Sequence, residues 1–281
     1  MYNSSRKFGQ KFNVWNMKQL IRTTVTALKH LRFSGLKNLH TTSRILQLSK
    51  IDETQEKLLN ERLILVDEND CVKGTETKKE CHLKRNILQY GMLHRAFSVF
   101  LFNTKGQLLL QQRSDVKITF PGCITNTCCS HPLYEDSELV EHGNVGVKVA
   151  AKRRLSYELG IPDNQISLED LRFLTRIHYR AGSDKIWGEH EIDYVFFVQK
   201  DVNLEPNANE VKRCWYVSEI ELKELLQKAA EDSNILVTPW FKMITDHFLY
   251  KWWASLRDLS QFENDSEIHK MPGVPAPVLQ L

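Results

Sequence analysis

The sequence of 281 residues has no long hydrophobic run. Its apolar stretches, such as residues 195–198, are far shorter than the roughly 20 residues that a membrane-spanning helix needs. We therefore expect no membrane span. With 42% hydrophobic and 26% charged residues, the chain can bury a core and does not have the composition of a disordered protein.

Paired cysteine motifs are also absent. No Cys-x-x-Cys occurs, and we find no apolar segment typical of a secretory signal ahead of the six scattered cysteines, which are Cys71, Cys81, Cys123, Cys128, Cys129 and Cys214. These absences exclude a disulfide framework and a structural zinc finger, and they favour a reducing compartment. Any metal must be held by ligands that lie far apart in the sequence.

Acidic residues are missing from the first 50 positions, which carry ten Lys or Arg. Because the whole chain has a net charge of +3, the remainder carries about −7. A protein that binds DNA or RNA through its body would place positive charge there, so we expect no nucleic-acid partner.

The basic segment is rich in Ser, Thr, Leu and Arg, and residues 17–31 can form an amphipathic helix, which is typical of a mitochondrial transit peptide. We expect a mitochondrial address. A solvated extension without an address, on a cytoplasmic or peroxisomal protein, is the alternative. The final residues VLQL do not resemble a peroxisomal signal, and residues 271–281, with three prolines, are expected to form a mobile tail.

Strand and helix patterns are mixed over residues 51–270, which we take as the folded core. Alternating and β-rich segments predict strands over residues 61–67, 96–103, 107–113, 171–178, 189–198 and 214–217. The second and third of these form a predicted hairpin around Gly106.

Three helices are indicated by periodic apolar residues and start signals. One begins near Val147 and ends before Gly160, a second begins after Ser218 with a capping box, and a third begins at Thr238 and Pro239. The third is expected to carry one apolar stripe, formed by Trp240, Ile244, Phe248 and Trp252.

Carboxylates two residues apart on a strand point to the same face, so Glu189 and Glu191 can share a hard cation, with Asp193 next on that face. Three imidazoles would complete an octahedral site for Mg²⁺, Mn²⁺ or Zn²⁺, and His82, His94 and His131 are the candidates. The alternative is a solvated strand face with ordinary histidines.

The motif TCCSHP, residues 127–132, places two thiols beside a candidate ligand histidine. A nearby cation would lower a thiol pKa, which makes Cys129 a candidate acid, base or nucleophile; a small buried hydrophobe is the alternative. Basic side chains that can bind a diphosphate, or can equally be solvated, are Lys78, Arg113, Lys117 and Arg154.

Seven motifs occur in one order: ETKKECH, LLQQRSDVKITFPG, TNTCCSHP, AAKRRLSYELGIP, RIHY, IWGEHEIDY and VTPWF. Together, over residues 58–268, they closely resemble the type I isopentenyl-diphosphate delta-isomerase family. The resemblance implies an α/β, Nudix-like fold with a mixed β-sheet flanked by helices, the Nudix-like domain covering about residues 92–242. It also implies interconversion of isopentenyl and dimethylallyl diphosphates, a need for Mg²⁺, with Mn²⁺ or Zn²⁺ as alternatives at the His/Glu site, and no flavin.

The resemblance also implies roles for individual residues. Proton transfer would fall to Cys129 and Glu191, with Tyr179 assisting, Cys128 as a supporting neighbour and Trp240 facing the hydrocarbon. The metal ligands would be His82, His94, His131, Glu189 and Glu191, while Glu158 would bind a second Mg²⁺ on the substrate. The diphosphate would be held by Lys78, Arg113, Lys117, Ser130 and Arg154. We expect a small-molecule diphosphate substrate and a monomeric protein.

The segment RRLSYELGI departs from the box of the Nudix hydrolases. Arg154 and Tyr157 stand where those enzymes commonly have glutamates, and only Glu158 remains. Loss of two carboxylates removes ligands of the metal cluster that activates water, so hydrolysis of a diphosphate is the lesser alternative. A non-catalytic diphosphate-binding relative is the other.

Overall fold

A computed structural model describes residues 51–273 of the chain, and the expectations for the basic segment and for residues 274–281 lie outside the described residues. The described helices are α3 (Glu53–Leu58), α4 (Lys78–His82), α5 (Lys84–Tyr90), η1 (His142–Asn144), α6 (Val145–Leu159), α7 (Glu219–Glu231), α8 (Pro239–Ile244), η2 (Thr245–Leu249) and α9 (Tyr250–Ala254). The strands are β1 (Arg62–Val66), β2 (Val72–Thr77), β3 (His94–Phe102), β4 (Leu108–Arg113), β5 (Ile124–Thr125), β6 (Cys128–Ser130), β7 (Arg172–Gly182), β8 (Gly188–Gln199), β9 (Val211–Val217) and β10 (Ile268–Lys270).

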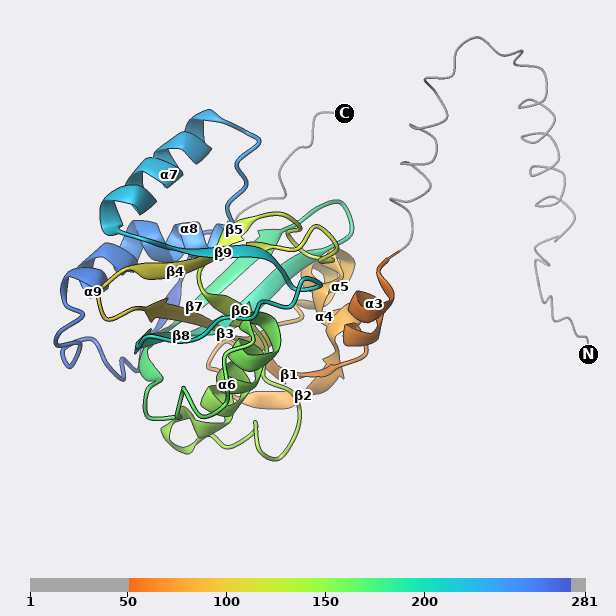
Figure 1. Cartoon of the computed structure of the whole chain (residues 1–281). Helices are drawn as coiled ribbons and strands as arrows, with labels where there is room; N and C mark the ends of the chain where they lie inside the picture. The colour runs from red at the N-terminus through yellow and green to blue at the C-terminus, as the bar shows by residue number, and fades with distance from the viewer. Residues whose placement is uncertain (1–50, 274–281) are drawn as a thin grey trace, which may run out of the picture. The chain divides into compact units, whose positions relative to one another are not determined.

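The strands form one mixed sheet in which β3 is the most connected member. It runs parallel to β8 along its whole length and antiparallel to β1, β4 and β6 (Figure 1). Strand β7 pairs antiparallel with β8, and β4 continues the sheet through β5 and β9. This confirms the predicted mixed α/β class with a mixed β-sheet.

Both faces of the central strands are buried, and alternate residues of β3 face different cores. Phe100 and Phe102 pack with α8 and α9, whereas Val99 and Leu101 pack with α6. In the view of Figure 1, α6 lies at the bottom and α8 and α9 at the upper left of the central strands. Because side chains alternate along a strand, His94 and Ser98 share the face of Phe100.

Helix α6 confirms the predicted period and stop. Val147, Ala151, Leu155 and Leu159 are all buried, and the helix ends at Gly160, whose φ of 64° is the left-handed conformation that glycine adopts most readily. The capping box at Ser218 is present as well. Among the helices of residues 51–273, none has the length and apolar character to cross a bilayer.

The predicted hairpin around Gly106 forms, but its strands pair only at Phe102 and Leu108. Beyond that point β3 turns to β6 and β8, while β4 turns to β9 and β5. The two strands separate because each buries its edge against another partner. The hairpin therefore joins two parts of the sheet rather than forming a two-stranded ladder.

The C-terminal helix differs from its prediction in two ways. The helix is interrupted by η2, a π-helical turn between α8 and α9, yet the four stripe residues share one core, in which Trp240, Ile244 and Trp252 are buried and Phe248 stacks on Trp252. Thr238 precedes the helix as expected, yet its side chain does not cap it. Its hydroxyl instead meets the Thr125 hydroxyl at 2.7 Å.

Candidate active site

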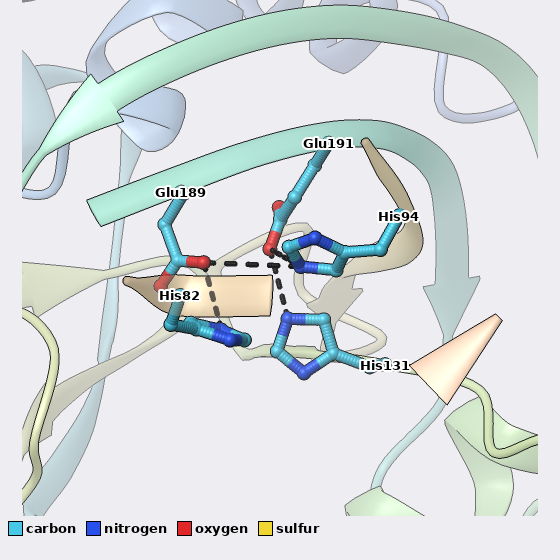
Figure 2. A group of neighbouring side chains, drawn as sticks. All are labelled: His82, His94, His131, Glu189 and Glu191. Carbon is cyan, nitrogen blue, oxygen red and sulfur yellow. Dashed lines mark hydrogen bonds and ion pairs between the residues drawn. The ribbon is translucent and has the colours of Figure 1, made fainter. Parts of the chain in front are cut away.

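Five buried side chains from four segments converge on one point (Figure 2). His82 ends α4, His94 begins β3, His131 follows β6, and Glu189 and Glu191 lie on β8. The register of the sheet brings them together, because parallel pairing sets His94 beside Glu191 and antiparallel pairing sets Tyr179 on the other side of Glu191. The ligand atoms of all five lie within 4.8 Å of one another.

Several polar atoms of this cluster have no hydrogen-bond partner among the described residues, whereas His131 Nε2 and Glu191 Oε1 form a hydrogen bond of 2.8 Å. His82 Nε2 and Glu189 Oε2 are 2.9 Å apart, yet both lack a hydrogen-bond partner among the described residues, as does His94 Nε2. His82 Nδ1 lies 2.6 Å from the Lys78 carbonyl, which only accepts, so Nδ1 carries a proton and Nε2 is the ring nitrogen that faces the Glu189 carboxylate. Buried lone pairs that converge in this way fit a bound divalent cation.

The protonation states suit the same interpretation. Burial, with His82 and His94 close by, lowers the pKa of His131 well below its ordinary value, so its ring is neutral at pH 7. Burial would raise the pKa of Glu191, but a hydrogen bond and charge from His94 and a hydrogen bond from Tyr179 hold it below its ordinary value. A neutral imidazole, as at His131, and an ionised carboxylate, as at Glu191, are the forms that bind metal.

A pocket of about 550 Å³, counting its open mouth, adjoins this cluster and is lined by Cys129, Tyr179 and Trp240 together with His82, His131, Glu189 and Glu191. The Tyr179 hydroxyl donates to Glu191 Oε2 at 2.6 Å. Burial raises the pKa of the Cys129 thiol well above its ordinary value, and the carboxylates of Asp193 and Glu191 add to the shift. A thiol that holds its proton and an ionised carboxylate therefore face one pocket.

The neighbouring thiol points the other way. Cys128 is fully buried in the core that contains α6, and it does not line the pocket. Strand alternation along β6 separates the two cysteines, since adjacent side chains leave opposite faces. This geometry distinguishes Cys129 from Cys128, which the sequence motif alone leaves equivalent.

Four of the five residues predicted to bind a diphosphate line the pocket: Lys78, Arg113, Lys117 and Ser130. Burial lowers the pKa of Lys117 to about 8, although the Glu210 carboxylate, which it contacts, opposes the shift. Arg113 is fixed by bonds to the carbonyls of Thr119 and Phe120, and its guanidinium carbon lies 5.7 Å from the centre of the Trp240 ring.

Two predicted site residues lie outside this lining. Arg154 is buried and donates to Glu158 Oε1 at 2.7 Å and to Glu210 Oε2 at 3.0 Å. Glu158 uses its other oxygen to accept from Gln111 at 3.2 Å. Their contacts with a substrate or a second Mg²⁺ stay predictions.

Sequence reasoning missed several residues around the pocket. Glu210 is almost fully buried and joins Lys117 to Arg154, but a single glutamate in a polar loop carries no signal for this role. Helix α3 contributes Gln55 and Leu58 to the lining, and Leu59 follows directly after it. Its start could have been read from Asp52, whose side chain accepts from the backbone of Thr54 and Gln55.

Asp193 continues the carboxylate face, as expected, but it does not join the cluster of five. It accepts a hydrogen bond from the Ser98 hydroxyl at 2.8 Å. Burial, followed by the charge of Glu191, raises the pKa of Asp193 well above its ordinary value. Asp193 is therefore bonded to Ser98 rather than grouped with the five clustered ligands.

Comparison with known proteins gives two kinds of match. Residues 92–241 match the NUDIX domain family. The chain is 58% identical over 223 residues to isopentenyl-diphosphate delta-isomerase 1 of Mesocricetus auratus, covering 79% of this chain and 97% of that protein. It is 51% identical to isopentenyl-diphosphate delta-isomerase 2 of Homo sapiens, covering 80% and 99%, and 50% identical to isopentenyl-diphosphate delta-isomerase I of Clarkia breweri, covering 79% and 78%.

The cluster predicts that divalent metal stabilises the fold. Protein stripped with a chelator and then supplied with Mn²⁺ or Zn²⁺ at 100 times its dissociation constant should gain about 2.7 kcal/mol in unfolding free energy. His94→Ala should lose most of this gain, because His94 is buried inside the cluster. His178→Gln, at a half-buried histidine outside it, should keep the gain. Thermal unfolding with elemental analysis measures both effects, and equal gains in the two variants would contradict the site.

Proposed function

Because the chain belongs to the isopentenyl-diphosphate delta-isomerase family of the Nudix superfamily, we propose that Cys129 and Glu191 are the two groups that transfer protons as it interconverts isopentenyl and dimethylallyl diphosphates. The reaction forms one C–H bond at the terminal alkene carbon and breaks another at the carbon two positions away. One group gives a proton, the other removes one, and the double bond moves by one position. The observation that carries this proposal is that a thiol and a carboxylate line the same pocket.

Two groups are needed because the alkene is unactivated. Its protonation creates a tertiary carbocation, which requires a strong acid close to one carbon and a base close to the other. Tyr179 supports Glu191 by donating to its Oε2, which leaves the carboxylate oriented toward the pocket. Since the reaction is reversible, the group that gives the proton in one direction removes it in the other.

Trp240 supplies the apolar wall that the carbocation needs. Its side chain is almost fully buried, packs edge-to-face with Phe120 and lines the same pocket as the charged cluster. An indole face next to a desolvated cation is worth about 2 kcal/mol. The same packing excludes water, which would otherwise trap the cation as an alcohol.

The residues that would hold the metal are His82, His94, His131, Glu189 and Glu191. We propose Mg²⁺ as the ion that acts in the cell, with Mn²⁺ or Zn²⁺ as alternatives at the three imidazoles, and no flavin. When bound, the cation supplies positive charge that compensates the buried carboxylates and tunes the acidity of Glu191. The chain's own contribution is a preformed set of donors on rigid strands.

The diphosphate hydrolase alternative finds little support in α6. Glu158 is the one glutamate left at the positions that hydrolases commonly use, and Arg154 already neutralises it at 2.7 Å. One carboxylate that already pairs with an arginine does not supply the several ligands of the metal cluster that activates water in the hydrolases. The isomerase function therefore stands ahead of hydrolysis.

Substitution of the two adjacent thiols tests the chemistry. With isopentenyl diphosphate and Mg²⁺, the wild-type protein should form dimethylallyl diphosphate, and Cys129→Ala should lose at least about a hundredfold in kcat because it removes a proton-transfer group. Cys128→Ala is the matched control: it removes a thiol of the same strand that faces the α6 core, so kcat should change little. Phosphate release instead of isomerisation, or an active Cys129→Ala, would contradict the proposal.

Lys117 predicts how substrate binding depends on pH. The pKa of its amine is about 8, so below this pH it is charged and attracts a diphosphate, and above it the charge is lost. KM for isopentenyl diphosphate should therefore rise as the pH is raised through 8. Lys117→Arg keeps its charge, so whatever its absolute KM, this rise should be absent. Lys105→Arg, in the turn after β3, is the control and should show the same rise in KM as wild type. If KM of Lys117→Arg also rises through pH 8, a group other than Lys117 titrates and the prediction is wrong.

For the compartment, we propose mitochondrial import through the basic residues 1–50. The support is the segment's ten basic and no acidic residues. Full-length protein should become protected from protease in isolated, energised mitochondria, and protein that starts at Ile51 should not. Equal protection of both, or of neither, would contradict import through this segment. The expectation of a monomer stays a prediction that light scattering can test.

A further inference from the structure

Asn126 lies between β5 and β6 and is fully buried, although it has no assigned part in the reaction. All of its hydrogen-bonding groups are used. Its Oδ1 accepts from the Trp240 indole Nε1 at 3.1 Å and from the Thr125 hydroxyl at 2.9 Å. Its Nδ2 donates to the carbonyls of Val99 and Cys128 at 3.1 and 2.9 Å.

We propose that Asn126 is a positioning residue that holds the indole of Trp240 and the strand of Cys129 at a fixed separation across the pocket. The inference rests on the proposed isomerase function, in which these two side chains face the same carbocation. Asn126 itself does not line the pocket and touches no substrate.

The contacts of Asn126 determine what it can orient. The Cys128 carbonyl belongs to the peptide unit that also contains the Cys129 nitrogen, so the bond from Nδ2 fixes the plane from which the Cys129 side chain starts. The bond from the indole fixes the rotation of Trp240 at the start of α8. One planar amide therefore couples two pocket walls that are 111 positions apart in the sequence.

The orientation of this amide is unambiguous. Rotating it by half a turn would place the NH₂ group against the indole N–H, and the oxygen against two carbonyls, so three bonds would be lost in a buried place; the Thr125 hydroxyl alone can bond either group. A second path strengthens the link to α8, since Thr125 also contacts the Thr238 hydroxyl at 2.7 Å. This use of Thr238 explains why it does not cap the helix.

From this role we expect that loss of the Asn126 side chain lowers kcat and leaves KM nearly unchanged. The side chains expected to grip the diphosphate, Lys78, Arg113 and Lys117, make no hydrogen bond to Asn126 among the contacts described. Arg113 lies 5.7 Å from the Trp240 ring, but its guanidinium is held by the carbonyls of Thr119 and Phe120, so a shift of the indole or thiol should leave substrate binding nearly unchanged and slow the proton transfers. A displacement of about 1 Å at a reacting centre can cost on the order of a hundredfold in rate.

The first experiment compares Asn126→Ala with Asn103→Ala. Asn103 is another buried asparagine with satisfied side-chain bonds, but it lies in the turn after β3, away from the pocket. Asn126→Ala should lower kcat by roughly ten- to a hundredfold with KM within about threefold of wild type. Asn103→Ala should lower the unfolding temperature without this split. An unchanged kcat, or a loss confined to KM, in Asn126→Ala would overturn the proposal.

A spectroscopic readout checks that the folded variants differ where expected. The indole N–H resonance of Trp240, identified by its absence in Trp240→Phe, should shift in Asn126→Ala because its acceptor is removed. It should keep its position in Asn103→Ala. An unmoved resonance in folded Asn126→Ala would show that the bond does not orient the indole.

A double-mutant cycle then tests whether Asn126 acts through Trp240. Trp240→Phe keeps an aromatic ring but lacks the Nε1 donor, so adding Asn126→Ala to it should cost at least about threefold less in kcat than adding it to wild type. If the kcat losses of the two single variants multiply in the double variant, Asn126 does not act through Trp240 and this coupling is refuted. Wild-type protein that makes no dimethylallyl diphosphate would instead refute the proposed function, so the two failures are distinguishable.

Discussion

The site depends on one electrostatic constraint: two carboxylates and three imidazoles are buried together with their lone pairs facing inward. Two negative charges in a dry interior are costly unless a positive charge accompanies them. Among the described residues, no Lys or Arg makes an ion pair with Glu189 or Glu191. The ion-pair partners of these two carboxylates are histidines. The fold thus creates a demand for a cation that the chain does not itself meet, and this demand defines where the chemistry takes place.

The pairing register of the strands, rather than a local sequence motif, brings these residues together. His94 and Glu191 are neighbours because β3 and β8 run parallel, and Tyr179 joins them through the antiparallel pairing of β7 and β8. Local patterns do predict part of the arrangement: the period of a strand places Glu189 and Glu191 on one face, and the periodicity of α6 identifies its buried residues. Pairing between strands about a hundred residues apart has no comparable local signal, so residue spacing alone could not join the histidines to the carboxylates. The motif resemblance supplied that connection.

The basic residues of the pocket show a second limit on what the sequence alone can predict. Lys78, Arg113 and Lys117 could be chosen from the sequence as anion-binding residues, and all three line the pocket. Arg154 belongs to the same sequence pattern, yet the buried Glu210 and Glu158 hold it beside the pocket. The same Glu210, from a distant loop, contacts both Lys117, which lines the pocket, and Arg154, which does not. A charge pattern cannot reveal such a partner, because it becomes a neighbour only after folding.

The two ends of the pocket are built by different means, and the reaction explains why both are rigid. The polar end is a set of buried ligands on strands, and the apolar end is an indole whose one donor is bound by Asn126. A carbocation has no hydrogen bond through which the protein can grip it, so its stabilisation depends on the placement of surrounding faces and charges. Because such interactions fall off with distance and angle, fixing Trp240 and Cys129 to one buried amide is an effective way to keep them aligned. Buried polar residues that contact no substrate can therefore matter for the rate through geometry alone.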